Sequence, residues 1–274
     1  MINRRNALAL LASCSLLPIN PASAEKTPPA DTFTGFNDLF REIGTVGSFA
    51  ALRNGKLIVN DNTRVREAIL PASTYKIPHS IIAIETGVVS DPDKDVFKWD
   101  GIRRGFEDWN QDHTLRSAIA ASAVPVYQQI AHNIGHERMQ KNLDALQYGN
   151  QNTNGGIDHF WLSGDLRISP LQQIDFLERL HQGTLPVSRR SQDLTLDILP
   201  VIKVGSSIIR AKSGLVGVDD RRGIENATVG WLTGYAETGS AMTIFALNVD
   251  ILEKRHVSDR AKLAERCLAA IDSI

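Results

Sequence analysis

A chain of 274 residues with 42% hydrophobic content is long enough to bury a full core, and its composition argues against a fibre or a disordered chain. The formal net charge of −1 and the pI near 6.7 provide no basic stripe for nucleic acid, so we expect a small molecule as the partner. This length favours one unit made of two subdomains.

Residues 1–24 have the pattern of a secretory signal peptide. Arg4 and Arg5 supply the charged start, residues 7–17 form the apolar centre, and Ala22-Ser23-Ala24 is the small-residue pattern that precedes a cleavage site. Cleavage after Ala24 would leave residues 25–274 as a single periplasmic or secreted domain.

The same segment has an alternative interpretation as a lipoprotein leader. Leu11-Ala12-Ser13-Cys14 is similar to a lipid-attachment box, which would anchor the chain at Cys14, but the apolar stretch before Cys14 is short. A transmembrane anchor is disfavoured because Pro18 and Pro21 interrupt the stretch before it could span a bilayer. We therefore expect no membrane association after the leader is removed.

The first elements after the leader are a short helix and a hairpin. An amphipathic helix is expected around Phe36. Strands at 48–52 and 57–59 flank Asn54-Gly55, a dipeptide that favours a hairpin because both residues tolerate positive φ.

Ser73 and Lys76 lie three positions apart at the start of an apolar helix. The apolar residues that recur at helical spacing are Ile77, Ile81, Ile84 and Val88. Residues three apart on a helix share a face, so Lys76 would lie beside Ser73 and act as the base that a serine nucleophile needs. Ser-x-x-Lys also occurs by chance on solvated surface helices, but the buried helix expected here would place Ser73 at a cleft.

The middle of the chain is predicted to be helical, and strands return after it. Helices are expected at 115–121, 125–134 and 137–146, with another that is capped by Ser169, begins at Pro170 and has Gln172 in the capping-box position. Strands are expected at 206–211, 228–236 and 241–249, before a terminal helix at about 258–271. The sequence therefore predicts an α+β fold: an antiparallel sheet flanked by helices, with a mostly helical insert at roughly 75–200.

Several short motifs occur in one order along the chain. They are Pro71-Ala72-Ser73-Thr74-Tyr75-Lys76-Ile77-Pro78, Ser122-Ala123-Val124-Pro125-Val126-Tyr127-Gln128, Tyr148-Gly149-Asn150, Phe160-Trp161-Leu162 and Lys212-Ser213-Gly214. Together they resemble the class D β-lactamases, the oxacillinases, from about Phe36 to about Ile271. The resemblance implies the fold of serine β-lactamases and penicillin-binding transpeptidases. It also implies an enzyme that hydrolyses penicillins and related β-lactams through an acyl-enzyme on Ser73 and confers antibiotic resistance.

The resemblance implies a catalytic role for several motif residues. Ser73 would be the nucleophile, Ser122 would relay a proton to the leaving ring nitrogen, and Lys212 would supply positive charge. Backbone N–H groups of Ser73 and Leu215 would stabilise the oxyanion. Without the other motifs, Ser122 would be interpreted as a serine at the start of a helix.

The resemblance also implies a set of substrate-binding residues. These are Val124, Ser213, Gly214, Leu215 and Arg260. Ser213 would contribute a hydroxyl, and Gly214 would let the substrate approach the strand closely. The guanidinium of Arg260 would grip the substrate carboxylate in bidentate fashion, although Arg255 and Arg266 lie nearby and Arg260 has the alternative role of an ordinary charged residue on the terminal helix.

In class D enzymes the lysine at the position of Lys76 carries CO₂ as a carbamate, so the resemblance implies this modification and neither a diffusible cofactor nor a metal. A lysine in an apolar pocket, which Val124, Leu162 and the apolar face of the helix would supply, loses its proton more readily because burial disfavours the charged form. The indole N–H of Trp161 would hydrogen-bond the carbamate, which would take the proton from Ser73 and later from water. Core packing is the alternative role for Trp161.

Two other functions remain as alternatives. A β-lactam sensor domain would acylate without turnover, but such domains are normally joined to membrane helices. A D,D-peptidase would act on cell-wall peptides, and Phe160-Trp161-Leu162 and Ser122-Ala123-Val124 argue against it. Ser213 replaces a more usual threonine and Leu215 an aromatic residue, so the substrate range stays open, as does the choice between monomer and homodimer.

Overall fold

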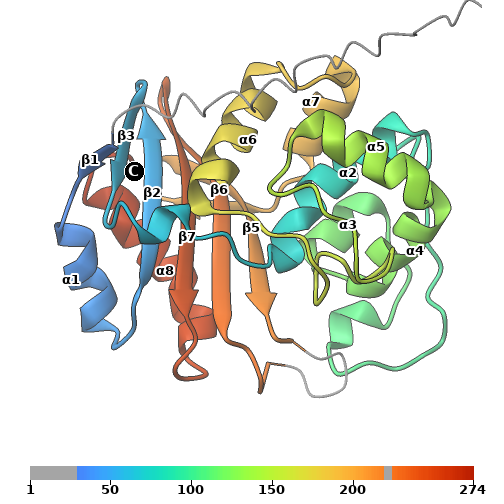
Figure 1. The fold of residues 1–274 in the computed structure, drawn as a ribbon, viewed down its shortest axis with the longest axis horizontal. Helices are drawn as coiled ribbons and strands as arrows, with labels where there is room; N and C mark the ends of the chain where they lie inside the picture. The colour runs from blue at the N-terminus through green and yellow to red at the C-terminus, as the bar shows by residue number, and fades with distance from the viewer. Residues whose placement is uncertain (1–29, 219–223) are drawn as a thin grey trace, which may run out of the picture.

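The computed structural model describes residues 30–218 and 224–274 (Figure 1). The expected leader at 1–24 and the alternative lipid site at Cys14 therefore lie outside the described residues. Among the described residues, every helix is too short or too polar to span a bilayer.

The described residues form a seven-stranded sheet in the order β1-β3-β2-β7-β6-β5-β4 (Figure 1). The strands are β1 (Ala30–Thr32), β2 (Gly47–Arg53), β3 (Lys56–Val59), β4 (Val201–Val204), β5 (Ser207–Val216), β6 (Val229–Thr238) and β7 (Ala241–Asp250). Every pairing is antiparallel except that of β1 with β3, which is parallel. The expected antiparallel sheet flanked by helices is thus confirmed, and the sequence did not predict the parallel edge strand because three residues are too few to show a period-two pattern.

The hairpin at Asn54-Gly55 is confirmed. Arg53 pairs with Lys56 across the turn, and both turn residues have positive φ, 50° at Asn54 and 72° at Gly55. The expected meander is also present, because β5, β6 and β7 pair in sequence along ten-residue strands.

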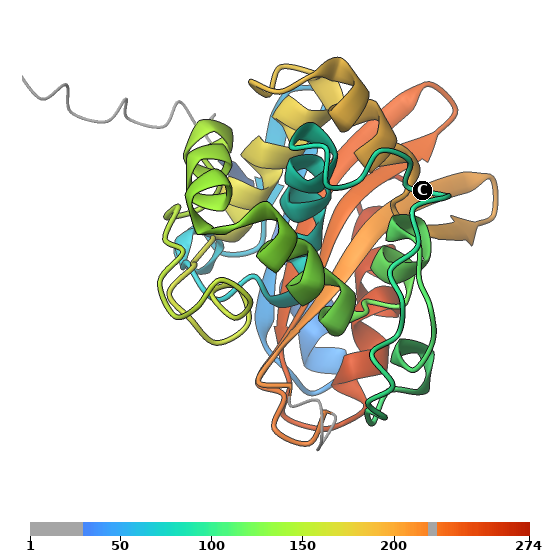
Figure 2. The ribbon, with the colours of Figure 1, turned by 90° about the vertical axis from the view of Figure 1, so that its right-hand side faces the viewer.

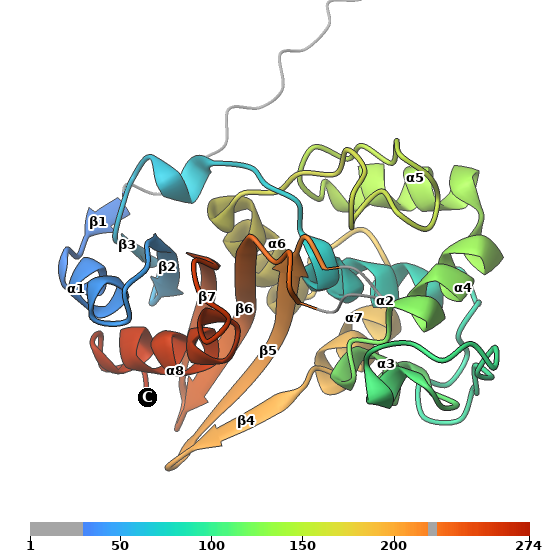
Figure 3. The ribbon, with the colours of Figure 1, turned by 90° about the horizontal axis from the view of Figure 1, so that it is seen from below.

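Helices cover both faces of the sheet and form a separate lobe beside it (Figures 1 and 3). They are α1 (Gly35–Glu42), α2 (Lys76–Glu85), α3 (Leu115–Ala120), α4 (Val124–Ile134), α5 (His136–Leu146), α6 (Pro170–Gln182), α7 (Arg189–Asp197) and α8 (His256–Ala269). Helices α1 and α8 pack together on one face, and α6 packs on β2 and β7 from the other. In the lobe, α2 contacts α4, α5 and α7, as Figure 2 shows from its side.

The sheet separates two hydrophobic cores. Strand β2 contributes to both, because Phe49 and Ala51 belong to the core under α1 and α8 while Ala50 and Leu52 belong to the core on the side of α6. The larger core continues from the sheet through α6 into the lobe, where α2 is buried along nearly its whole length. The residues at the start of α2 are therefore held between the sheet and the lobe.

Helix α6 begins as the sequence predicts. Pro170 is its first residue, Ser169 Oγ accepts a 3.2 Å hydrogen bond from the backbone N–H of Gln172, and Gln172 Oε1 accepts a 2.9 Å bond from the N–H of Ser169. This capping box fixes the entry of α6 onto the sheet.

Candidate active site

Ser73 lies in a short 3₁₀ turn, Ala72–Tyr75, that leads directly into α2. The helix that the sequence predicts thus begins as a tighter turn at Ser73 and becomes α-helical at Lys76. Ala72 has a positive φ of 47°. This conformation is energetically unfavourable for any residue with a side chain, and it occurs most often at functional sites.

Thr74 anchors this turn. Its hydroxyl donates a 2.7 Å hydrogen bond to Pro71 O and accepts one of 2.9 Å from Gln173 Nε2 of α6. The neighbouring strand adds a further tie, because Trp231 Nε1 donates to Leu70 O at 2.9 Å. Contacts from both sides therefore hold Ser73 in place, as the preorganisation of a nucleophile requires.

Lys76 is fully buried and its Nζ donates a 2.8 Å hydrogen bond to Ser73 Oγ. Burial, together with the positive charge of Lys212, holds the pKa of Lys76 well below its usual range. A neutral amine beside a serine hydroxyl is able to accept the hydroxyl proton or to react with an electrophile such as CO₂.

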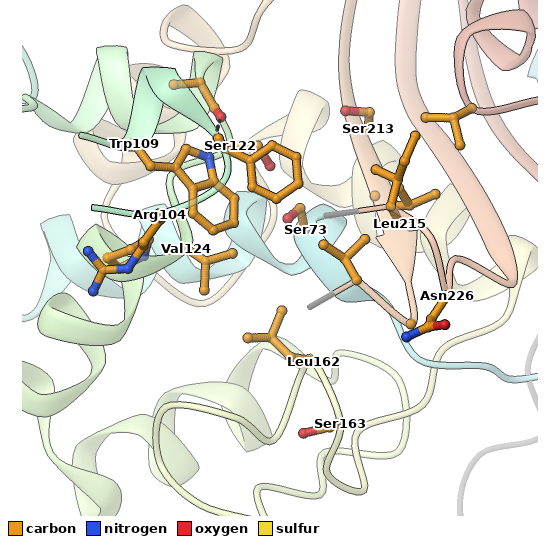
Figure 4. Close-up of a pocket in the computed structure, with 18 of the residues that line it drawn as sticks. Ser73, Arg104, Trp109, Ser122, Val124, Leu162, Ser163, Ser213, Leu215 and Asn226 are labelled. Carbon is orange, nitrogen blue, oxygen red and sulfur yellow. Dashed lines mark hydrogen bonds between the residues drawn. The ribbon is translucent and has the colours of Figure 1, made fainter. Parts of the chain in front are cut away.

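Ser122 lies in the turn between α3 and α4 and also has positive φ, 55°. Lys212 Nζ, on β5, donates to Ser122 Oγ at 3.1 Å and to Ser213 O at 3.0 Å. Burial, and then the charge of Arg260, lowers the pKa of Lys212 to about 7. The turn is held from the cavity side by Trp109, whose Nε1 donates to Ala121 O at 3.1 Å (Figure 4).

Gly214 brings β5 against the turn that carries Ser73. A Cβ at this position would lie 2.9 Å from Pro71 O and 3.1 Å from Thr74 Cγ2. The close packing of the protein on itself thus requires a glycine here, and Gly214 also lies in the wall of the cavity described below.

The site opens into a cavity of about 620 Å³, a volume that suits a small molecule. The sequence-predicted residues in its wall are Ser73, Ser122, Val124, Leu162, Ser213, Gly214, Leu215 and Arg260. In Figure 4, Ser73 lies between the Ser122 and Val124 side and the strand that carries Ser213 and Leu215. Lys76, Trp161 and Lys212 lie behind this wall, where each is at most 2% exposed.

Sequence reasoning missed part of the cavity wall. The additional residues include Arg104, Phe106, Trp109, Gln128, His159, Ser163 and Asn226. Most of them lie on irregular segments, which leave no periodic pattern in a sequence. The stacked rings of Phe106 and Trp109, with centroids 4.4 Å apart, show that one such loop packs as a unit against the cavity.

Of the three arginines that the sequence leaves open for the carboxylate, Arg260 lies in the cavity wall. Burial lowers its pKa to about 10, and its Nη1 donates to Val257 O. Arg255 is instead paired with Glu253 on the surface, and Arg266 is paired with Glu42. The geometry therefore favours Arg260 for this position.

Aromatic rings enclose the far side of Lys76. Its Nζ lies 5.1 Å from the ring centroid of Tyr127, and Tyr127 lies 5.1 Å from His79. The His79 ring in turn lies 5.2 Å from that of Trp161, which stacks on Tyr75 at 5.5 Å. Among the described residues, Trp161 Nε1 and both ring nitrogens of His79 are buried without a hydrogen-bond partner. Such orphaned groups are uncommon in a folded protein.

Comparison with known proteins agrees with this geometry. The family model for the penicillin-binding protein transpeptidase domain matches residues 37–269. The chain is 43% identical to β-lactamase OXA-48 of Klebsiella pneumoniae over 70% of each protein, and 41% identical to β-lactamase OXA-5 of Pseudomonas aeruginosa over 77% of this chain and 78% of the relative.

Solved structures give the same result. The crystal structure of FUS-1 (OXA-85), a class D β-lactamase from Fusobacterium nucleatum subsp. polymorphum, matches with a TM-score of 0.81 at 31% identity and covers 89% of this chain and 100% of its own. The class D β-lactamase YbXI from Nostoc matches with a TM-score of 0.81 at 36% identity, over 88% of this chain and 100% of its own. The family model, the curated relatives and the solved structures all agree, and the chain belongs to the class D β-lactamases.

Proposed function

We propose that the protein hydrolyses penicillins and related β-lactams through an acyl-enzyme on Ser73 and so confers β-lactam resistance. The observation that carries the proposal is the 2.8 Å hydrogen bond between Ser73 Oγ and the buried Lys76 Nζ, at the wall of a cavity of about 620 Å³. The relatives reported above are themselves named β-lactamases.

In the acylation step, Ser73 Oγ attacks the carbonyl carbon of the lactam ring while a base beside it takes the hydroxyl proton. The carbonyl oxygen becomes negative and would accept hydrogen bonds from the backbone N–H groups of Ser73 and Leu215. When the C–N bond breaks, the electron pair stays on the ring nitrogen. Ser122 Oγ, which Lys212 Nζ contacts at 3.1 Å, would deliver the proton that this nitrogen needs.

We propose that Lys76 carries CO₂ as a carbamate. The lone pair of the neutral Nζ forms a bond to the carbon of CO₂, one C=O electron pair moves to oxygen, and one N–H proton is released to solvent. The carbamate supplies a carboxylate base for the proton of Ser73 during acylation and for a proton of water during deacylation. Burial favours the neutral form of Lys76, and the orphaned indole N–H of Trp161, in the same aromatic cluster, is a donor that suits a buried carboxylate.

The cavity wall suits a bicyclic substrate with a carboxylate. Arg260, and Lys212 in its protonated form, are cations with little access to water, so each would interact strongly with an anion in the cavity. Ser213 offers a hydroxyl on the same strand. Apolar contact would come from Val124, Leu162 and Leu215.

We further propose that the protein works in the periplasm or as a secreted enzyme, with the lipoprotein anchored at Cys14 as the alternative.

Measuring turnover distinguishes a β-lactamase from a β-lactam sensor or a D,D-peptidase. The protein should hydrolyse many equivalents of a chromogenic cephalosporin or a penicillin, whereas a single stoichiometric burst would indicate a binding module. Mass spectrometry should find the transient acyl group on Ser73, and Ser73→Ala should remove it. Ser163→Ala removes a cavity serine that, among the described residues, lacks the lysine hydrogen bond present at Ser73, so this variant should acylate normally.

A further inference from the structure

His79 is a buried polar residue that the reaction described above does not use. It lies one helical turn after Lys76 on α2 and is fully buried. Among the described residues, neither of its ring nitrogens has a hydrogen-bond partner. A neutral imidazole carries one N–H donor and one acceptor, so both capacities are left unused in the unmodified protein. Ordinary core packing would favour an apolar ring here, because it would leave no polar atom unsatisfied.

The position of His79 relates it to the Lys76 amine. The centroid of the Tyr127 ring lies 5.1 Å from Lys76 Nζ and 5.1 Å from the centroid of the His79 ring, so the amine and the imidazole both lie beside one aromatic ring. The positive charge of Lys76 is close enough to affect His79, whose pKa falls to about 3 through burial and then through this charge. His79 is therefore a neutral group at neutral pH and a poor general base.

Two unsatisfied donors thus lie in the cluster behind Lys76, one on Trp161 and one on His79, whose rings are 5.2 Å apart. Other polar atoms nearby are already paired, because Tyr127 OH bonds Ser80 Oγ at 2.8 Å and Tyr75 OH donates to Met139 Sδ at 3.1 Å. A carboxylate has more acceptor capacity than one indole N–H satisfies.

We propose that His79 is a positioning residue for the modified lysine: its imidazole N–H donates a hydrogen bond to the carboxylate on Lys76 and shares that anion with the indole of Trp161. The inference rests on the proposed carbamate. It explains why a histidine occupies a fully buried position with no partner in the unmodified protein. His79 would stabilise the modified state of Lys76 without touching the substrate.

The test measures CO₂ uptake by the full-length enzyme without substrate, using ¹³C NMR of the carbamate signal during titration with labelled bicarbonate at constant pH. His79→Phe keeps a ring of similar size and removes both nitrogens, so the bicarbonate concentration for half modification should rise about tenfold or more, as expected for a lost hydrogen bond to a charged group. His79→Gln, which restores an N–H donor, should recover most of the affinity. Tyr75→Phe is the matched control, because it removes from the same cluster a hydroxyl that is already bonded to Met139 Sδ. This variant should titrate like wild type.

A second measurement uses only the wild-type enzyme, so a variant that fails to fold cannot affect its result. In wild-type enzyme labelled with ¹⁵N-histidine, bicarbonate should shift the N–H nitrogen of His79 in parallel with the growth of the carbamate signal. If wild type forms the carbamate while His79→Phe titrates identically, or if the His79 signal does not move, His79 is a packing residue and the inference is wrong. If wild type forms no carbamate at all, the proposed function of Lys76 fails and this inference fails with it.

Discussion

Lys212 Nζ donates its hydrogen bond to Ser122 Oγ across the boundary between the sheet and the helical lobe, joining β5 to the turn before α4. The amine is only 2% exposed, and its pKa falls to about 7 because of burial and the nearby Arg260. A group to which we assign a role in the proposed reaction should thus weaken the fold, since its charged form is held away from water.

This cost gives a prediction about stability and pH. In the unfolded chain Lys212 has its ordinary pKa of 10.5, so between about pH 7 and pH 10.5 the unfolded state binds the extra proton. The free energy of unfolding therefore rises with pH across this window, and below it the penalty is fully present. Lys212→Met should raise the free energy of unfolding by about 1–3 kcal/mol near pH 7, with less gain near pH 10. Urea unfolding at both pH values measures this.

Lys203→Met is the control for that experiment. Lys203 is exposed on β4 and its replacement should leave the pH dependence unchanged. A Lys212→Met protein that is no more stable than wild type at neutral pH would show that the amine is better solvated than its position indicates.

Gly214→Ala should damage both stability and activity. The new Cβ would meet Pro71 O at 2.9 Å, and because this is a backbone atom, either β5 or the Ser73 turn must move. We expect a loss of about 1–3 kcal/mol in the free energy of unfolding and a fall in kcat. Ser213→Ala, one residue away, is the control and should retain near wild-type thermal stability. Equal melting temperatures for the two variants would mean that the Ser73 turn accommodates the new Cβ without loss of stability.

Much of this site could be predicted from the sequence because its parts have local patterns. The three-residue spacing of Ser73 and Lys76 places them in contact, and the capping box at Ser169 and the Asn54-Gly55 turn depend on neighbouring residues alone. The order of the motifs then identified the family. The roles of Ser122, Trp161 and Arg260 came from the resemblance and remain proposals.

The features of the site that could not be predicted from the sequence depend on contacts between residues far apart in the chain. Gly214 meets Pro71, and Trp231 meets Leu70, only because the sheet folds back onto the turn before α2. The positive φ of Ala72 is imposed by these contacts and has no signal in the residue itself. The unpaired ring nitrogens of His79 likewise depend on its neighbours in space and have no signal in the sequence.

Arg260→Ala should raise KM for a penicillin more than it lowers kcat. Its guanidinium lies in the cavity wall and would hold the substrate carboxylate in the ground state as well as in the transition state, so its loss removes uniform binding. Steady-state kinetics at saturating bicarbonate should show a rise in KM of about tenfold or more. Arg255→Ala, at an exposed arginine paired with Glu253, is the control and should keep wild-type constants. Equal effects in the two variants would move the carboxylate site elsewhere.

Activity should depend on CO₂ through Lys76. A carbamate forms only from a neutral amine and is lost on acidification, and burial already favours the neutral form of Lys76. Enzyme held at low pH, or depleted of CO₂, should lose turnover while it still reacts at Ser73, and bicarbonate should restore the rate after return to neutral pH.

Two variants separate the modification from a plain amine. Trp161→Phe removes the indole donor and keeps an aromatic ring, so it should raise the bicarbonate concentration for half-maximal rate by about tenfold or more, because a buried anion without its hydrogen bond is costly. Lys76→Ala should be nearly inert at any bicarbonate concentration. Labelled CO₂ should give a carbamate signal by ¹³C NMR in wild type and none in Lys76→Ala. The proposal would be wrong if, after thorough acid treatment, the wild-type rate did not depend on bicarbonate and no carbamate signal formed. Lys76 would then act as an unmodified amine, since its Nζ already lies 2.8 Å from Ser73 Oγ.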